Sequence, residues 1–95
     1  MERFGLVSQT RRAAASVPAN LAEGSARGTD GDFARFARIS LGSAAELEYH
    51  LLLAADLGYL DRDAYDALRG ELSEIKRMLT GLITHLAKRT AAGGA

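Results

Sequence analysis

With 95 residues, 47% of them apolar, the sequence has room for one domain and enough apolar side chains to exclude an intrinsically disordered chain. Aromatic residues make up only 6% and tryptophan is absent, so the core has to be built from Leu, Ala, Ile and Val. Twelve basic and twelve acidic residues cancel, which excludes a whole-molecule field that would draw the protein onto nucleic acid or an anionic membrane, and any basic site has to be a local patch.

The first predicted element is a helix over residues 5–23 that is kinked by a proline. Pro18 lacks a backbone N–H and clashes with the carbonyl oxygen of Ala14, so a helix that contains it bends. The segment over residues 24–31 follows, with glycines next to Ser, Thr and Asp, and we interpret it as a loop. A weak apolar stripe marks the core-facing side of this helix: Leu6, Ala13, Val17 and Leu21.

The second predicted element is a helix that begins near Asp30 or Asp32 and ends near Leu57, where Gly58 supplies a C-terminal cap. One stripe faces a neighbouring helix: Phe33, Ala37, Ser40, Ala44, Leu47, Leu51 and Ala54. A further apolar set lies off that stripe: Phe36, Ile39, Leu41, Leu52 and Leu53. This helix is apolar on more faces than a three-helix core needs, so we expect part of it to contact another chain.

The third predicted element is the most regular helix. Asp61 precedes it as an N-cap, and Lys88 and Arg89 close it with charges that suit the helix dipole. Its apolar residues alternate in spacings of three and four along one face: Tyr65, Leu68, Leu72, Ile75, Leu79, Leu82 and Leu86. With no strand pattern elsewhere, we predict an all-α fold, an antiparallel helical bundle in a single domain over residues 1–90, followed by a frayed tail over residues 91–95.

Polar side chains recur every four residues in the first helix and therefore share one of its faces. They are Ser8, Arg12, Ser16 and Asn20. One interpretation is a face turned to solvent. The other is a polar seam between helices or subunits, because Pro18 frees the Ala14 carbonyl, and Ser16 or Asn20 could satisfy exposed backbone groups at the kink. The residues alone leave both interpretations open.

Glu46 and His50 lie four residues apart and share a face of the second helix. A di-iron bundle needs Glu-x-x-His pairs on two helices and glutamates from two more, so we expect no metal here. We predict that Glu46 forms a salt bridge with Arg11 or Arg12 on the neighbouring helix and holds a polar seam in register. His85 flanks the last apolar stripe and is interpreted as a boundary residue.

No group of residues has the spacing of a known catalytic site. The glycine-rich stretch that starts at Gly24 has no preceding strand and lacks the Gly-Lys-Ser/Thr ending of a P-loop. No Ser and His are arranged for nucleophilic catalysis, and the absence of Cys removes thiolate chemistry, disulfides and Cys-based zinc sites. We therefore expect a non-enzymatic protein with no cofactor and no small-molecule substrate.

The sequence also indicates the cellular compartment in which the protein is expected. No apolar run approaches the roughly 18 residues of a membrane span, and the N-terminus lacks the apolar core of a signal peptide. The absence of Cys fits a reducing environment. We expect a cytoplasmic protein with no membrane partner.

Four segments together resemble a known family. They are Phe-Gly-Leu-Val-Ser-Gln over residues 4–9, Arg-Arg-Ala over 11–13, Ser-Val-Pro-Ala-Asn-Leu-Ala-Glu-Gly over 16–24 and Leu-Gly-Ser-Ala-Ala-Glu-Leu-Glu over 41–48. The sequence resembles the four helix bundle proteins encoded by intervening sequences in bacterial 23S rRNA genes. The resemblance runs from Phe4 to about Leu86, and the run from Val17 to Gly24 is its most specific part.

The resemblance implies a helical bundle, a ring-shaped homopentamer and binding to RNA or DNA, in a family whose molecular function is not settled. It also implies a family polar seam: Ser8, Arg12, Ser16, Pro18, Asn20, Glu23 and Glu46. Members of the family carry a further amphipathic helix ahead of the Phe-Gly-Leu segment, whereas here Met1 comes shortly before it. We therefore expect a bundle that lacks the first helix, with three helices covering faces built for four.

Two hypotheses for function differ in the role of the arginines of the first half: Arg3, Arg11, Arg12, Arg27, Arg35 and Arg38. Residues 1–45 hold six basic and four acidic residues, a net charge of +2, and residues 46–95 hold six and eight, a net charge of −2. In the first hypothesis a homo-oligomer binds nucleic acid through these side chains. In the second, the arginines pair with Glu23, Glu46 and Glu48 inside a protein-interaction module. Buried arginines favour the second hypothesis, and a solvent-facing cluster favours the first.

Overall fold

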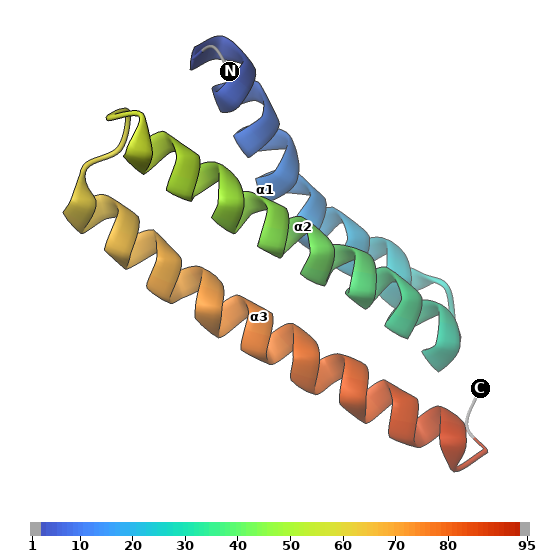
Figure 1. Cartoon of the computed structure of the whole chain (residues 1–95). Coiled ribbons are helices and arrows are strands. Elements are labelled where there is room, and N and C mark those ends of the chain that lie inside the picture. Colours follow the sequence, from blue (N-terminus) through green and yellow to red (C-terminus); the bar gives the residue numbers. More distant parts are fainter. Residues whose placement is uncertain (1–2, 94–95) are drawn as a thin grey trace.

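A computed structural model describes residues 3–93, with side chains from residue 5 onward. It consists of three helices, α1 (Arg3–Ala26), α2 (Asp30–Asp56) and α3 (Arg62–Ala91). Consecutive helices run antiparallel, and α2 packs against both neighbours, whereas no Cα atom of α1 comes within 8 Å of one of α3 (Figure 1). The expected all-α fold of antiparallel helices is confirmed. None of the three helices combines the length and the hydropathy needed to cross a membrane.

The first helix is longer than predicted. It passes through Pro18 without interruption, and Figure 1 shows its ribbon bending along its length while it remains helical. It ends at Ala26, so the loop predicted over residues 24–31 is wrong at both ends and only residues 27–29 lie between the helices. The physical reason is Gly24. A Cβ atom there would lie 2.6 Å from the Cβ of Phe36, so this glycine allows α1 to approach α2 rather than ending the helix.

Local capping determines both ends of α2, and the Gly58 cap at its C-terminal end was predicted. The Thr29 hydroxyl accepts a hydrogen bond of 3.1 Å from the backbone N–H of Asp32. At the C-terminal end Gly58 has a φ of 80°, its N–H donates to the Ala55 carbonyl, and the Tyr59 N–H donates to the Ala54 carbonyl at 2.9 Å. This pair of bonds is the Schellman arrangement that glycine favours, because it has no Cβ to clash at positive φ.

The third helix also begins as expected. The Asp61 carboxylate caps α3 by accepting a hydrogen bond of 2.8 Å from the Ala64 N–H. The helix ends at Ala91, so the first residue of the predicted tail is still helical, and residues 94–95 of that tail lie outside the described residues. An ion pair of 2.9 Å between Arg89 and Asp30 joins the end of α3 to the start of α2.

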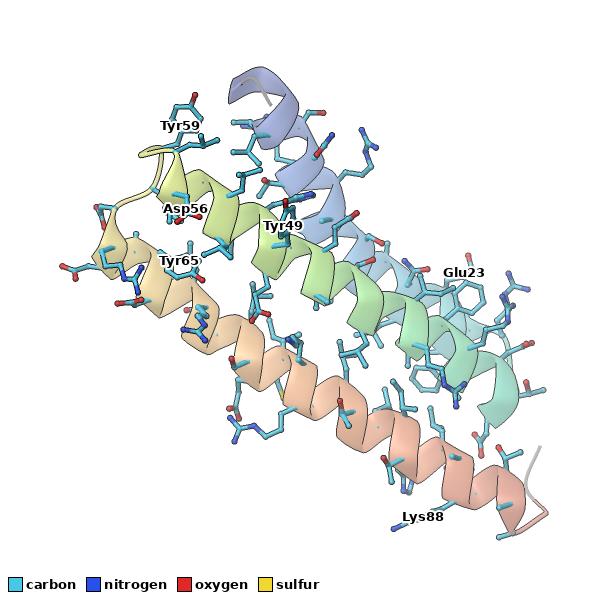
Figure 2. The ribbon with its side chains drawn as sticks, viewed as in Figure 1. Glu23, Tyr49, Asp56, Tyr59, Tyr65 and Lys88 are labelled. Atoms are coloured by element: carbon cyan, nitrogen blue, oxygen red, sulfur yellow. The ribbon has the colours of Figure 1, made fainter. Side chains whose placement is uncertain are left out.

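The predicted apolar stripe of α3 divides into two sets. Tyr65, Leu72, Leu79 and Leu86 recur every seven residues and are buried, and Figure 2 shows Tyr65 in the space between α2 and α3. The intervening residues are more open: Ile75 and Leu82 are half-buried and Leu68 is exposed. Ala44, Leu72 and Leu79 form the centre of the core. One partner helix can cover only one side of the stripe, and α2 is that helix.

Candidate functional site

Two of the four residues in the predicted polar row belong to the contact with α2: Ser16 contacts it directly, and Asn20 supports Ser16. The hydroxyl groups of Ser16 and Ser43 share a hydrogen bond of 2.7 Å, and the Asn20 amide donates to the Ser16 carbonyl at 2.8 Å and to its hydroxyl at 2.9 Å. Nearby, the fully buried Ser40 donates to the Val17 carbonyl at 2.8 Å. We call these four polar residues the serine seam: Ser16, Asn20, Ser40 and Ser43. It is a contact between helices of one chain.

The other residues assigned to the polar seam lie elsewhere. Ser8, Arg12, Pro18 and Glu46 are exposed. Glu23, seen near the end of α1 in Figure 2, accepts a hydrogen bond of 3.1 Å from the Nε of Arg27. The row therefore combines both interpretations, since its later part contacts α2 and Ser8 faces solvent. The sequence signal that could have found Ser40 is a serine inside an otherwise apolar stripe.

A second polar feature is a hollow of about 200 Å³ between α1 and α2. We call it the polar hollow, and its lining residues are Gln9, Arg12, Glu46 and His50. His50 is 6% exposed, and its Nδ1 atom has no hydrogen-bond partner among the described residues. No three metal-ligating side chains gather here or elsewhere in residues 3–93.

The salt bridge predicted from Glu46 to Arg11 or Arg12 is not among the ion pairs of the described residues, so this prediction is wrong. Glu46 and both arginines are exposed. Closing an exposed ion pair gains little, because water screens the charges and two long side chains lose freedom. The ion pair that does join the middles of two helices links Glu48 to Lys76 across 3.1 Å.

Among the arginines proposed for nucleic acid, the five with described side chains are exposed, but these five do not form one cluster. Arg27 and Arg35 converge on Phe36, with their guanidinium carbons 4.9 and 4.5 Å from the ring centre. Arg38 follows Arg35 by about one helical turn. Arg11 and Arg12 lie in α1, about four helical turns before Arg27 and near the polar hollow. The Arg3 side chain lies outside the described part.

Both arginines over Phe36 have an acidic neighbour. The Arg27 Nε lies 3.1 Å from a Glu23 oxygen, and an Arg35 nitrogen lies 3.8 Å from an Asp32 oxygen. The ring and the carboxylates orient the two guanidinium groups, and their remaining N–H groups stay available to a ligand. This arrangement can hold a phosphate or a carboxylate at the end of the molecule where α1 meets α2.

An apolar groove separates α1 from α3 on one side of α2. We call it the α1–α3 trough, and its volume is about 430 Å³. The lining residues are Val17, Pro18, Leu21, Ile75, Met78, Leu79 and Leu82. Met78 is 62% exposed, although it is a large apolar side chain. The sequence predicted surplus apolar surface on the second helix, whereas much of this groove comes from the first and third.

Comparison with known proteins identifies the family. Residues 1–81 match the family model described as 23S rRNA-intervening sequence protein. The chain belongs to the 23S rRNA-intervening sequence protein family. No curated protein matches it.

A solved structure is similar in fold to this chain. It is the 1.70 Å crystal structure of a protein of unknown function from the S23 ribosomal protein family of Bacteroides thetaiotaomicron VPI-5482. The two superpose with a TM-score of 0.79 at 29% sequence identity. The match covers 82% of this chain and 72% of that one.

Proposed function

We propose that this protein acts without catalysis, as a homo-oligomer in the bacterial cytoplasm that binds RNA or DNA. The observation that carries the nucleic-acid part is the pair of guanidinium groups held over Phe36 by Arg27 and Arg35. The observation that carries the oligomer is the α1–α3 trough. Arg27 and Arg35 face solvent in the single chain, as phosphate binding requires.

The oligomer would cover the trough. Helices α1 and α3 flank α2 without approaching each other, which leaves the place of a fourth helix in a bundle open. Val17, Leu21 and Met78 border this place, and exposing apolar side chains in one groove costs free energy that a second copy would recover. The family resemblance favours five copies, with a helix of a neighbouring copy completing each four-helix unit.

The nucleic-acid contact would be made to phosphates. Arg27 and Arg35 are partly neutralised by Glu23 and Asp32, so one copy offers a weak site. A symmetric oligomer repeats the site and raises the avidity. Contacts of arginine with phosphates neutralise charge and release counterions, but they carry no base information.

The test of binding is a fluorescence anisotropy titration of labelled RNA and DNA at several salt concentrations. Binding should weaken as salt rises, with a logarithmic slope near −0.9 for each duplex phosphate contacted. The double variant Arg27→Ala, Arg35→Ala should lower both affinity and slope. The matched control is Arg62→Ala, Arg77→Ala, since these residues also pair with acids on their own helix but lie on α3.

The alternative is a protein-interaction module with no nucleic-acid role. The observation in its favour is that Arg27 and Arg35 already have acidic partners within the chain. An intact oligomer that binds neither RNA nor DNA at about 100 µM, the weak end of nonspecific binding, would leave this alternative standing. Light scattering tests assembly separately, and a stable monomer at micromolar concentration would contradict the oligomer.

A further inference from the structure

The polar hollow brings opposite charges together without pairing them. Arg12 comes from α1 and Glu46 from α2, and both line the same space of about 200 Å³. Neither forms an ion pair with another described residue. A guanidinium group and a carboxylate thus flank one hollow with their hydrogen-bonding edges unused. Gln9 adds an amide that can both donate and accept.

His50 adds a buried ring to the floor of this hollow. It is 6% exposed, and Nδ1 is the buried side-chain atom without a hydrogen-bond partner among the described residues. An unpartnered buried lone pair is more readily tolerated than an unpartnered N–H. The neutral ring is therefore best drawn with its proton on Nε2, which makes Nε2 a donor. The hollow is then lined by the donor groups of Arg12 from α1, and by the acceptor Glu46 and the His50 ring from α2.

An aromatic side chain lies next to His50, although the hollow that it lines is the one between α2 and α3. Tyr49, labelled on α2 in Figure 2, is 60% exposed and its ring centre lies 6.2 Å from that of His50. Exposed aromatic rings in nucleic-acid-binding proteins serve as stacking surfaces for unpaired bases. An exposed ring of this kind therefore lies near His50, which lines the polar hollow.

We propose that the polar hollow binds the base of an unpaired guanine nucleotide, an inference that rests on the proposed nucleic-acid function. Guanine presents two adjacent donors, N1–H and the N2 amine, and two adjacent acceptors, O6 and N7. A carboxylate matches the first pair and a guanidinium matches the second. Glu46 accepts from N1–H and N2, and Arg12 donates to O6 and N7.

The other bases fit this arrangement less well. Adenine, cytosine and uracil each offer a single donor group on the Watson–Crick edge, so one oxygen of Glu46 would stay unpaired. Glu46 is exposed in the free protein, but a bound base would cover it, and a carboxylate oxygen that loses water without gaining a partner costs free energy. Sites of this kind discriminate between bases for that reason. The hollow would give the oligomer a base preference that the arginines near Phe36 cannot supply.

The experiment is an NMR titration of the 15N-labelled full chain with the 5′-monophosphates of guanosine, adenosine, inosine and xanthosine. All four carry the same phosphate and sugar, so differences report the base. Guanosine monophosphate should bind about 5- to 150-fold more tightly than adenosine monophosphate, the range for one well-made bidentate contact, and should shift the resonances of His50. Inosine monophosphate, which lacks the N2 amine, should fall between them.

Glu46→Gln gives the sharpest test, because it predicts a reversal. The glutamine amide can accept from N1–H and donate to the C2 carbonyl that xanthine carries in place of the guanine amine. The variant should bind guanosine monophosphate more weakly than the parent protein does, and xanthosine monophosphate more tightly. The control is Glu48→Gln, which removes the same charge two residues away on a side chain that contacts Lys76 and not the hollow.

Equal affinity for all four nucleotides, or an unchanged preference in Glu46→Gln, would overturn the proposal. A third result would also overturn it: the parent protein shows no base preference, and Glu46→Gln dissociates the oligomer. The polar hollow would then be a contact between copies. Binding of RNA or DNA polymers through Arg27 and Arg35 is measured separately. If the protein binds RNA or DNA polymers but shows no preference among the nucleotides, the guanine proposal is wrong and the proposed nucleic-acid function stands.

Discussion

The two helix contacts of this protein are built from different side chains. Where α1 meets α2, small residues and hydroxyl groups take part beside the apolar side chains, with Gly24 against Phe36 and the serine seam alongside. Where α2 meets α3, large apolar residues fill the contact, and Leu72 and Leu79 pack on Ala44. Glu48 and Lys76 add an ion pair beside that second contact.

The contrast implies different sources of stability. Large apolar side chains contribute in proportion to the area that they bury, and they need little directional precision. A contact of small residues depends on close backbone approach and on hydrogen bonds that have to be made once water is excluded. The α2–α3 contact should therefore respond to lost volume, and the α1–α2 contact to added volume or lost hydroxyl groups.

The largest effect is expected for Leu79→Ala in the α2–α3 contact. Leu79 is 4% exposed, and its truncation leaves a cavity that should lower the free energy of unfolding by about 2–5 kcal/mol. The control is Met78→Ala, because Met78 is 62% exposed and should change stability by about 0.5 kcal/mol or less in the monomer. Urea denaturation measures both, and equal losses would contradict the contrast.

Gly24→Ala should have the next largest effect, in the α1–α2 contact. The added Cβ would lie 2.6 Å from the Phe36 Cβ and 3.2 Å from the Phe33 Cδ1, so the helices have to separate, at a cost of about 1–3 kcal/mol. In Gly42→Ala the new methyl group meets nothing within 4 Å, and alanine should stabilise the exposed helix by about 0.5–1 kcal/mol. If thermal denaturation shows a lower melting temperature for Gly24→Ala and a higher one for Gly42→Ala, the packing role of Gly24 is supported.

A smaller loss is expected for Ser40→Ala, which removes the hydroxyl that donates to the Val17 carbonyl at 2.8 Å. The net contribution of such a bond is about 0.5–1.5 kcal/mol. Ser73→Ala on the exposed surface of α3 is the control and should leave stability almost unchanged. If both variants behave alike in urea, the serine seam contributes nothing to the α1–α2 contact.

The smallest effect is expected for Lys76→Met at the edge of the α2–α3 contact. The side chains of Lys76 and Glu48 are 33% and 30% exposed, so the ion pair is partly screened and should contribute about 1 kcal/mol or less. Repeating the denaturation at high salt should shrink the difference between the variant and the parent protein. A loss that is large and independent of salt would show that the lysine stem, rather than its charge, stabilises the contact.

Sequence reasoning was accurate for the helices and poor for the candidate site. The bounds of α2 and its Gly58 cap were predicted because capping depends on residues a few positions apart. The convergence of Arg27 and Arg35 on Phe36 was not predicted, although all three were named, since it requires the approach that Gly24 allows. The predicted salt bridge from Glu46 to Arg11 or Arg12 was likewise wrong, and Glu46 and Arg12 instead line the polar hollow without an ion pair.

The sequence by itself determined the three helices, their antiparallel order and the period of their apolar stripes. These follow from hydrogen bonds and side-chain spacing within one helix, which are local. Only the tertiary structure decided that Tyr65, Leu72 and Leu79 are buried while Leu68 stays exposed, although all four belong to one stripe. A stripe records that a face is apolar, but the burial of each residue depends on where a second helix, distant in sequence, lies against it.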